Sequence, residues 1–384
     1  MDIVVEETVA ADFITALQTR IQPVSPLDSM AEAGRKVLLA DFVKMLQHEA
    51  GSRSGADIED VHDMRVATRR MRSALRLLAP YFKEKVIYTF GRRLRKVARA
   101  LGAVRDLDVM IEGIEHYAQT LTAPPKPARK KKQAAADGAA SEAAQEAAQE
   151  AAQEAAQEAA QEAAQEAAQE AAQEAAQETA QADPAVTAAA LQEVIAMLKF
   201  QREALRADLI DVLDSKRYRR FVQAYSVFLT TPGMGISHDS LYPLGLTLPM
   251  LAYEHLAAVR AYAHNHDIES AAPDILHALR VEFKRMRYAV SLFSAVLGTE
   301  IDGFIDDLKK IQDHLGRLND VVVAQAALGD LLTDLDTEQA VALQHYIDAL
   351  AAEQVQLQST FLSVWQRFNT KTVQRKLALA LTAL

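Results

Sequence analysis

A basic helical motif occurs twice in this chain of 384 residues, and this duplication restricts the possible folds more than any other feature. The first copy, His62–Leu78, reads HDMRVATRRMRSALRLL, and the second, His277–Phe293, reads HALRVEFKRMRYAVSLF. A second pair of segments, Lys96–Val109 and Lys310–Val323, extends the similarity, because both keep a Leu-Gly step followed by an aspartate. Self-similarity at such a long period indicates a duplicated structural unit. We therefore expect two related halves.

The spacing of apolar residues predicts helices along most of the chain, and no segment alternates with the period of two that a strand requires. Asp57 is a candidate N-cap, while Gly102 and the segment GSRSGAD after Ala50 are candidate helix ends. We predict an all-α fold of two pseudo-symmetric helical bundles. The expected helices are Met30–Ala50, Ile58–Ala79, Lys83–Leu101, Val104–Leu121, Ala185–Asp214, Lys216–Leu229, Thr247–His264, Pro273–Leu297, Ile301–Leu315, Arg317–Leu335 and Glu338–Phe368.

The chain divides into an N-terminal extension (1–29), a first bundle (30–230), a second bundle (231–370) and a C-terminal tail (371–384). The first bundle contains an insertion (122–184) with nine copies of AAQE. A period of four rotates the apolar face by about 40° per copy relative to the helical turn. No fixed apolar stripe forms, so we expect a solvated helical spur or a disordered tether with no specific function.

Positive charge is concentrated in the basic motif although the formal net charge is −10. The AAQE insertion holds ten Glu, and removing them leaves the remaining chain formally neutral. Residues 61–105 alone carry thirteen Lys and Arg against two acidic residues. Because salt screens charges beyond about 10 Å, this local excess determines which partners are attracted.

The basic residues of each motif lie on one side of the predicted helix. At about 100° per residue, five residues of the first copy fall within an arc of about 80°, opposite the apolar residues: His62, Arg65, Arg69, Arg72 and Arg76. The following helix repeats the arrangement, although Asp306 and Asp313 stand in the second half where the first has Arg92 and Arg99. A multivalent anion would relieve the repulsion between these cations, and arginine grips phosphate bidentately. The candidate ligands in the first half are His62, Arg65, Arg69, Arg70, Arg72, Arg76, Arg92, Arg95, Lys96 and Arg99, and those in the second are His277, Arg280, Lys284, Arg285, Arg287, Lys309, Lys310, His314 and Arg317.

The doubled pattern H-x-x-R-V-x-x-[RK]-R-M-R, followed in each half by L-G-x-x-[RN]-D, resembles the CHAD family, the conserved histidine α-helical domain. The resemblance implies two helical bundles around a central basic cavity, binding of inorganic polyphosphate and recruitment to polyphosphate granules. It maps the basic positions of the family onto His62, Arg65, Arg69, Arg70 and Arg72, and onto His277, Arg280, Lys284, Arg285 and Arg287. Some relatives carry an N-terminal CYTH triphosphatase domain with an ExExK signature. This chain has only VVEETVA there, so we expect no triphosphatase activity.

Several other classes of function are not expected. The chain has no cysteine, and its acidic start and interrupted apolar segments predict neither a secretory signal nor a membrane span. We expect a cytoplasmic, granule-associated protein without catalysis, metal or cofactor, in which Asp106 and Asp320 brace basic residues. Granule proteins are further candidate partners. A nucleic-acid binder, an enzyme acting on phosphoanhydrides and an accessory subunit of a polyphosphate-metabolising enzyme are the alternatives. Base recognition usually needs aromatic and amide groups, which are scarce in the motifs, so we do not expect nucleic acid as the ligand.

Overall fold

The computed structural model describes residues 11–55, 57–122, 183–237, 242–268 and 271–384, and the AAQE insertion lies outside these ranges. The prediction of an all-α fold is confirmed. Within the described ranges, the only β structure is two isolated bridges, Ser29 to Pro243 and Phe82 to Ile236. None of the helices in these ranges is long and apolar enough to cross a membrane.

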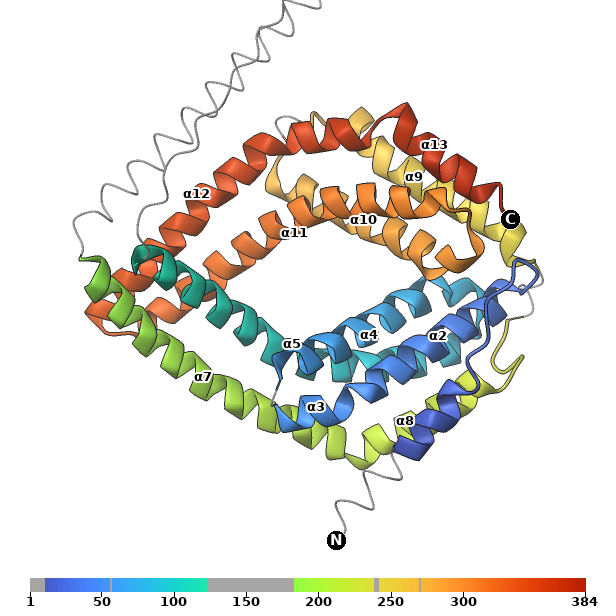
Figure 1. Ribbon diagram of the computed structural model, residues 1–384, viewed down its shortest axis with the longest axis horizontal. Coiled ribbons are helices and arrows are strands. Elements are labelled where there is room, and N and C mark those ends of the chain that lie inside the picture. The colour runs from blue at the N-terminus through green and yellow to red at the C-terminus, as the bar shows by residue number, and fades with distance from the viewer. Residues whose placement is uncertain (1–10, 56, 123–182, 238–241, 269–270) are drawn as a thin grey trace, which may run out of the picture. The chain divides into compact units, whose positions relative to one another are not determined.

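The order of the elements repeats along the chain (Figure 1). Each repeat has one helix, then the basic helix, a 3-10 turn, two long helices and a short helix. The first repeat consists of α2 (Met30–Gln47), α4 (Ile58–Leu77), η1 (Ala79–Tyr81), α5 (Glu84–Thr122), α7 (Pro184–Asp214) and α8 (Lys216–Thr230). The second consists of α9 (Leu244–Asn265), α10 (Pro273–Leu292), η2 (Ser294–Val296), α11 (Glu300–Leu331), α12 (Thr337–Phe368) and α13 (Lys371–Leu381). Outside this pattern lie a helix at residues 11–18, α3 (Glu49–Ser54) and η3 (Leu332–Asp334).

Two predicted helix ends at glycine are wrong. Helix α5 continues through Gly102, and α11 continues through Gly316. A glycine inside a helix costs only about 1 kcal/mol relative to alanine. That cost is offset here because Leu101 and Leu315, the residues just before these glycines, are both buried in the core.

Other boundaries were predicted in part. Asp57 caps α4 as expected, its side chain accepting a hydrogen bond from the Glu59 amide. The helix predicted to reach Ala50 ends at Gln47 instead, and the short α3 follows it after His48. Helix α3 ends at Gly55, inside the predicted break GSRSGAD, and the φ of 67° at this glycine is the left-handed conformation of a helix C-cap. Helix α13 was not anticipated in the tail, although it buries four apolar side chains and is capped by Thr370.

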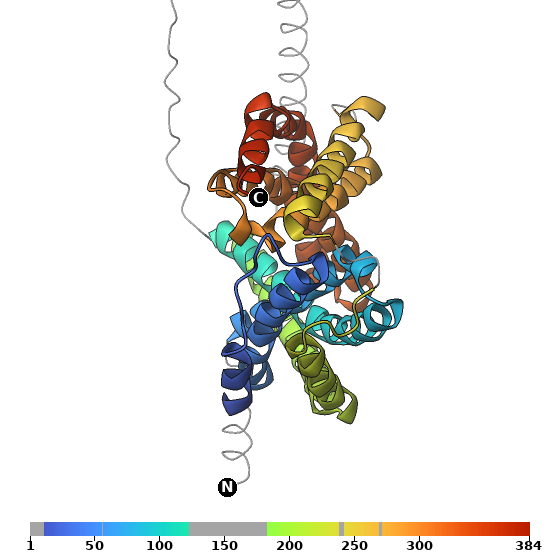
Figure 2. The same cartoon turned by 90° about the vertical axis from the view of Figure 1, so that its right-hand side faces the viewer.

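The described chain forms two compact units. Unit 1 comprises residues 1–111, 197–316 and 362–384, and it contains both basic helices, α4 and α10. Within it α2 packs on α4, α9 packs on α10, and α4 also contacts α10 (Figures 1 and 2). Its first-repeat core is built around Phe42, Phe90 and the apolar face of α8, with ring centroids of Phe90 and Tyr225 4.8 Å apart.

The described part of unit 2 comprises residues 112–122, 183–196 and 317–361, which are end segments of α5, α7 and α11 together with most of α12. The rings of Tyr117 and Tyr346 lie 5.0 Å apart. Gln325 donates to Gln354 at 2.9 Å, linking α11 to α12. These contacts show that the ends of the long helices form a packed bundle of their own.

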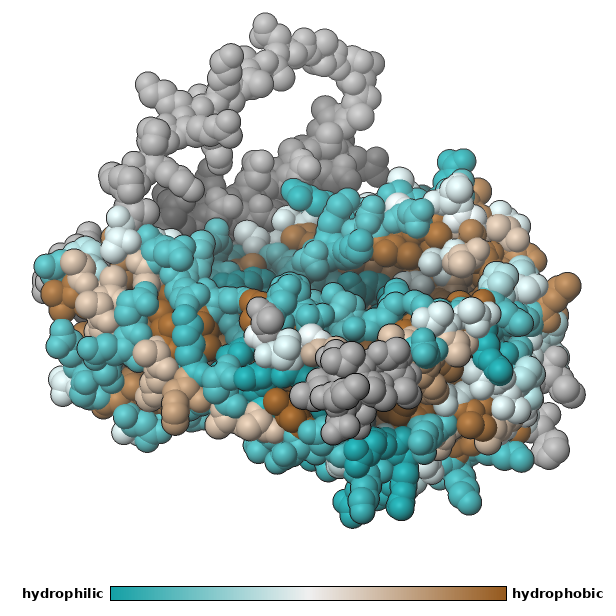
Figure 3. Space-filling view, turned by 60° about the horizontal axis from the view of Figure 1, so that its bottom comes forward, coloured by the Kyte–Doolittle hydropathy of each residue, from teal (hydrophilic) through white to brown (hydrophobic). Residues whose placement is uncertain are grey.

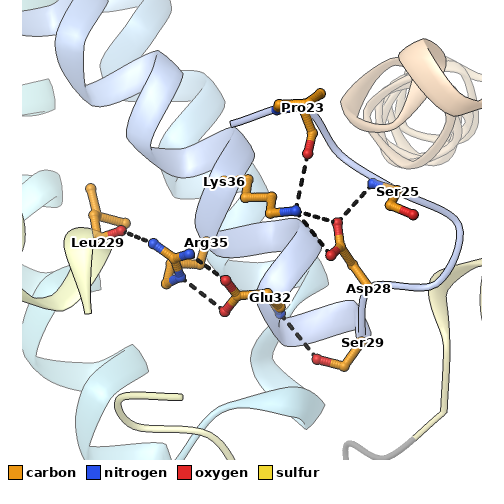
Figure 4. A network of polar contacts seen from close by, with 8 residues as sticks. All are labelled: Pro23, Ser25, Asp28, Ser29, Glu32, Arg35, Lys36 and Leu229. Atoms are coloured by element: carbon orange, nitrogen blue, oxygen red, sulfur yellow. Dashed lines mark hydrogen bonds and ion pairs between the residues drawn. The ribbon is translucent and has the colours of Figure 1, made fainter. Parts of the chain in front are cut away.

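Two cations at the start of α2 have structural roles (Figure 4). The buried Arg35 side chain hydrogen-bonds Glu32 and the backbone carbonyl of Leu229 at the end of α8. Lys36 pairs with Asp28 at 2.8 Å and donates to the carbonyl of Pro23 at 3.0 Å. Both contacts hold other segments against α2 and leave neither cation available for a ligand.

We expect Arg35→Leu to lower the free energy of unfolding by about 2–4 kcal/mol, because the change leaves Glu32 and the Leu229 carbonyl without their partner. Chemical denaturation measures the effect, with Lys44→Ala on the exposed side of the same helix as a control. Equal stability of the two variants would contradict the role given to Arg35.

Candidate anion-binding site

Helix α4 holds a row of cations in place by burying its other side. Met64, Met71 and Leu75 are inaccessible or nearly so in the core of unit 1. The opposite side carries the predicted row His62, Arg65, Arg69, Arg72 and Arg76, with Arg69 and Arg76 exposed. No carboxylate within the described ranges pairs with Arg69, Arg72 or Arg76. Their charge is therefore open to a ligand.

Two further cations of the motif already have acidic partners. Arg65 donates to Asp106 on α5 at 3.2 Å, so Asp106 braces a basic residue as predicted. The Arg70 Nε atom lies 3.0 and 3.1 Å from the two carboxylate oxygens of Asp41, which is buried in α2. Burial raises the pKa of Asp41, and the charge of Arg70 opposes that rise. Arg70 therefore serves the packing of α4 on α2.

Helix α5 places a second row beside the first. Arg92, Arg95, Lys96 and Arg99 are all exposed, and none of them pairs with a carboxylate in the part of the chain that the structure describes. The pKa of the Arg72 guanidinium is lowered, first by burial and then by the positive charges of Arg76 and Arg95. The rows of α4 and α5 thus form one region of uncompensated positive charge.

A pocket of about 470 Å³ opens between α5 and α8, and we call it the α5–α8 pocket. Its lining residues are Arg92, Arg93, Arg95, Lys96, Arg99 and Arg217. Arg93 and Arg217 were not among the predicted ligands. The segment KRYRR at the start of α8, which contains Arg217, is visibly basic in the sequence. Nothing in the sequence, however, indicated that α8 packs beside α5.

In the second repeat, several matching cations are paired with acids. Arg285 pairs with Glu282 at 2.6 Å, Lys309 with Asp306 at 3.6 Å, and Lys310 with Asp307 at 3.1 Å. Burial tends to raise the pKa of Asp307, but hydrogen bonds from Lys376 and Lys310 outweigh this effect and lower the pKa. Four more predicted ligands already interact with other residues of the chain, namely His277, Arg280, Lys284 and His314.

Two predicted ligands of the second repeat differ from this pattern. Arg287 lies 5.9 Å from the ring centroid of Tyr288 and has no carboxylate partner among the residues described. Arg317 belongs to unit 2, where a bidentate pair with Glu353 at 2.6 Å raises its pKa. Seven cations of the first repeat, Arg69, Arg72, Arg76, Arg92, Arg95, Lys96 and Arg99, thus lack a carboxylate partner among the described residues, whereas in the second repeat Arg285, Lys309, Lys310 and Arg317 are paired with acids.

The fold and the site define a duplicated all-α protein whose first repeat presents unpaired arginine and lysine. A family model for the CHAD domain matches the chain twice, at residues 36–199 and 173–329. The chain belongs to the CHAD domain family, as the doubled motif predicted.

Two solved structures show the same fold. PptA from Streptomyces chartreusis matches with a TM-score of 0.58 at 13% identity, covering 88% of this chain and 99% of that one. The CHAD domain from the plant Ricinus communis matches with a TM-score of 0.53 at 20% identity, covering 95% of each chain. No curated protein matches the sequence.

Arg69 and Arg70 are adjacent in sequence, but Arg70 pairs with buried Asp41 whereas Arg69 is exposed. Matched variants of the two arginines should therefore differ in stability. We expect Arg70→Leu to lower the free energy of unfolding by about 1–3 kcal/mol, since it removes the partner of buried Asp41. Arg69→Leu should change it by less than about 0.5 kcal/mol. Denaturant melts measure both values, and a larger loss for Arg69→Leu would refute the assignment.

Proposed function

We propose that this protein binds inorganic polyphosphate, without catalysis, through the cations of α4 and α5 in the first repeat. The observation that carries the proposal is the group of cations on these helices that lack carboxylate partners among the described residues. Cations three or four residues apart on a helix lie about 5–6 Å from one another and repel. A linear polyanion contacts many of them at once and releases the counterions they attract.

Surface chemistry supports a phosphate polymer over a base-containing one. On the face drawn in Figure 3, hydrophilic side chains predominate and apolar ones form scattered patches. Beside the cations of α4 and α5, Tyr88 is an exposed aromatic, and its ring lies under Arg92 at 5.9 Å. Stacking of bases generally needs several such rings. Displacement of long-chain polyphosphate by RNA at equal phosphate concentration would favour a nucleic-acid binder instead.

Binding without turnover is part of the proposal. Phosphoryl transfer generally uses acidic residues that hold a metal ion. Two carboxylates that contact α4, Asp41 and Asp106, are already bound to Arg70 and Arg65. We expect no release of phosphate from polyphosphate in the presence of magnesium. Release that depends on the protein would show that it is an enzyme.

We further propose that polyphosphate binding recruits the protein to polyphosphate granules. A fluorescent fusion should overlap with stained granules and should disperse in cells that lack polyphosphate. Fluorescent foci that persist in such cells would point to a protein partner, as expected for an accessory subunit of a polyphosphate-metabolising enzyme.

The unequal pairing of the two repeats provides a matched test. Arg95 and Lys96 align with Lys309 and Lys310, but only the second pair has acidic partners. We expect Arg95→Ala with Lys96→Ala to weaken binding of long-chain polyphosphate by more than about tenfold and to reduce the salt slope by about 1.4. Lys309→Ala with Lys310→Ala should weaken it by less than about threefold.

Fluorescence anisotropy with end-labelled polyphosphate at 50 and 200 mM salt measures both double variants. Circular dichroism confirms that each variant keeps its helical content. Equal losses in the two repeats would show that both bind the polymer. Wild-type affinity in the first double variant would refute the proposed site.

A further inference from the structure

The α5–α8 pocket collects positive charge from two helices and from a helix terminus. Helix α5 supplies five of its six lining cations, and α8 supplies Arg217. The Ser215 hydroxyl caps α8 by accepting a hydrogen bond from the Tyr218 amide. Lys216 and Arg217 therefore occupy the first turn of α8, which contains no acidic residue. The first amides of a helix have no intrahelical partner, and the helix dipole places positive charge at this end.

This arrangement is unfavourable without an anion. Cations at a helix N-terminus oppose the dipole, and cations one turn apart on α5 repel. Neither Arg93 nor Arg217 pairs with a carboxylate within the ranges that the structure covers. A bound anion would offset both unfavourable interactions at once.

The corresponding place in the second repeat is neutralised by the chain itself. The Thr370 side chain caps α13 by accepting a hydrogen bond from the Val373 amide, three residues later. Ser215 caps α8 in the same way with the Tyr218 amide, so the starts of the two helices correspond in sequence. Where the first repeat has Arg93, α11 has Asp307, which accepts from Lys376 of α13 at 2.5 Å. The first repeat has an arginine at the place of this acid, so the charge at this position differs between the two repeats.

The lining of the pocket indicates the chemistry of its ligand. Pockets for small molecules usually measure about 300–1,000 Å³ and are mainly apolar. This one, at about 470 Å³, is lined by five arginines and one lysine. Guanidinium groups bind phosphate oxygens in pairs of hydrogen bonds. Several guanidiniums around one small volume favour a compact anion with several phosphate groups over a single phosphate.

We propose that the α5–α8 pocket is a distinct site for a compact linear oligophosphate about the size of triphosphate, held by Arg93 and Arg217 together with the α5 row. This inference rests on the proposed function, because it assigns the same polyanion chemistry to a further part of the surface. The oligophosphate is either a free molecule or the end of a longer chain whose remainder follows the α4 row. Arg93 and Arg217 give this site its specificity.

Calorimetric titration of the full chain with tripolyphosphate tests the site. We expect Arg217→Ala and Arg93→Gln each to lower the affinity for tripolyphosphate about tenfold, the loss expected for one charge-assisted contact. Arg219→Ala and Arg220→Ala are matched controls, because they remove the same charge from exposed positions of α8 that do not line the pocket. The controls should change the affinity less than about twofold, since exposed charges contribute little.

A second arm separates this site from the α4 row. The double variant Arg69→Ala with Arg76→Ala should weaken the binding of long-chain polyphosphate and leave the binding of tripolyphosphate unchanged. The Arg217→Ala variant then distinguishes the two forms of the ligand at equal phosphate concentration. If the pocket takes chain ends, the change should weaken binding of short chains more than binding of very long ones. If the pocket takes free oligophosphate, the change should weaken binding of tripolyphosphate alone.

Absence of tripolyphosphate binding, or equal losses for Arg217→Ala and Arg219→Ala, would overturn the pocket assignment. Binding of tripolyphosphate that depends on Arg217, with no binding of long chains, would support the pocket and refute the proposed function. Melting temperatures of all variants within about 2 °C of the wild type would show that the losses are not due to unfolding.

Discussion

The burial of the apolar sides of α4 and α5 is the constraint on which the site depends. Like charges one turn apart repel, and an isolated helix with this sequence would gain little from its cations. In unit 1, however, Met64, Met71 and Leu94 are inaccessible to solvent, and each buried side chain of this size contributes about 1.5–3 kcal/mol. The packing therefore holds Arg69, Arg72 and the α5 row in an arrangement that their charges alone oppose. The pKa of Arg72 is lowered first by its burial, and the positive charges of Arg76 and Arg95 lower it further.

The two repeats share a plan but have diverged in charge. The aspartates of α11 at 306 and 307 align with Arg92 and Arg93 of α5, and they pair with lysines of α11 and α13. Among the described residues, the α5 row of the first repeat has no acidic partner, while the matching lysines of α11, Lys309 and Lys310, form internal ion pairs. Such ion pairs on a surface add little stability, but they remove the charge that a polyanion would need.

Much of the fold could be predicted from the sequence, because helical periodicity and the duplication are local signals. The boundaries failed where tertiary burial outweighed a local preference, as at Gly102 and Gly316. Helix α13 was missed although its signal is local, since its buried residues, Val373, Leu377, Ala380 and Leu381, stand at helical spacing after the cap Thr370. For the site, the helical wheel identified the row on α4 but could not show that Arg70 turns to Asp41 on another helix. Arg217 was out of reach for the same reason, since only the packed structure brings α8 beside α5.

The dependence of long-chain polyphosphate affinity on salt, measured on the wild-type chain between 50 and 400 mM, tests the central claim most directly. Each phosphate neutralised on a flexible single-stranded polyanion contributes about −0.7 to the slope of log affinity against log salt. With six or more unpaired cations engaged together, the account gives a slope of about −4 or steeper. A slope near about −1 would mean that one or two cations carry the binding, and it would contradict the view of α4 and α5 as a single polyanion surface.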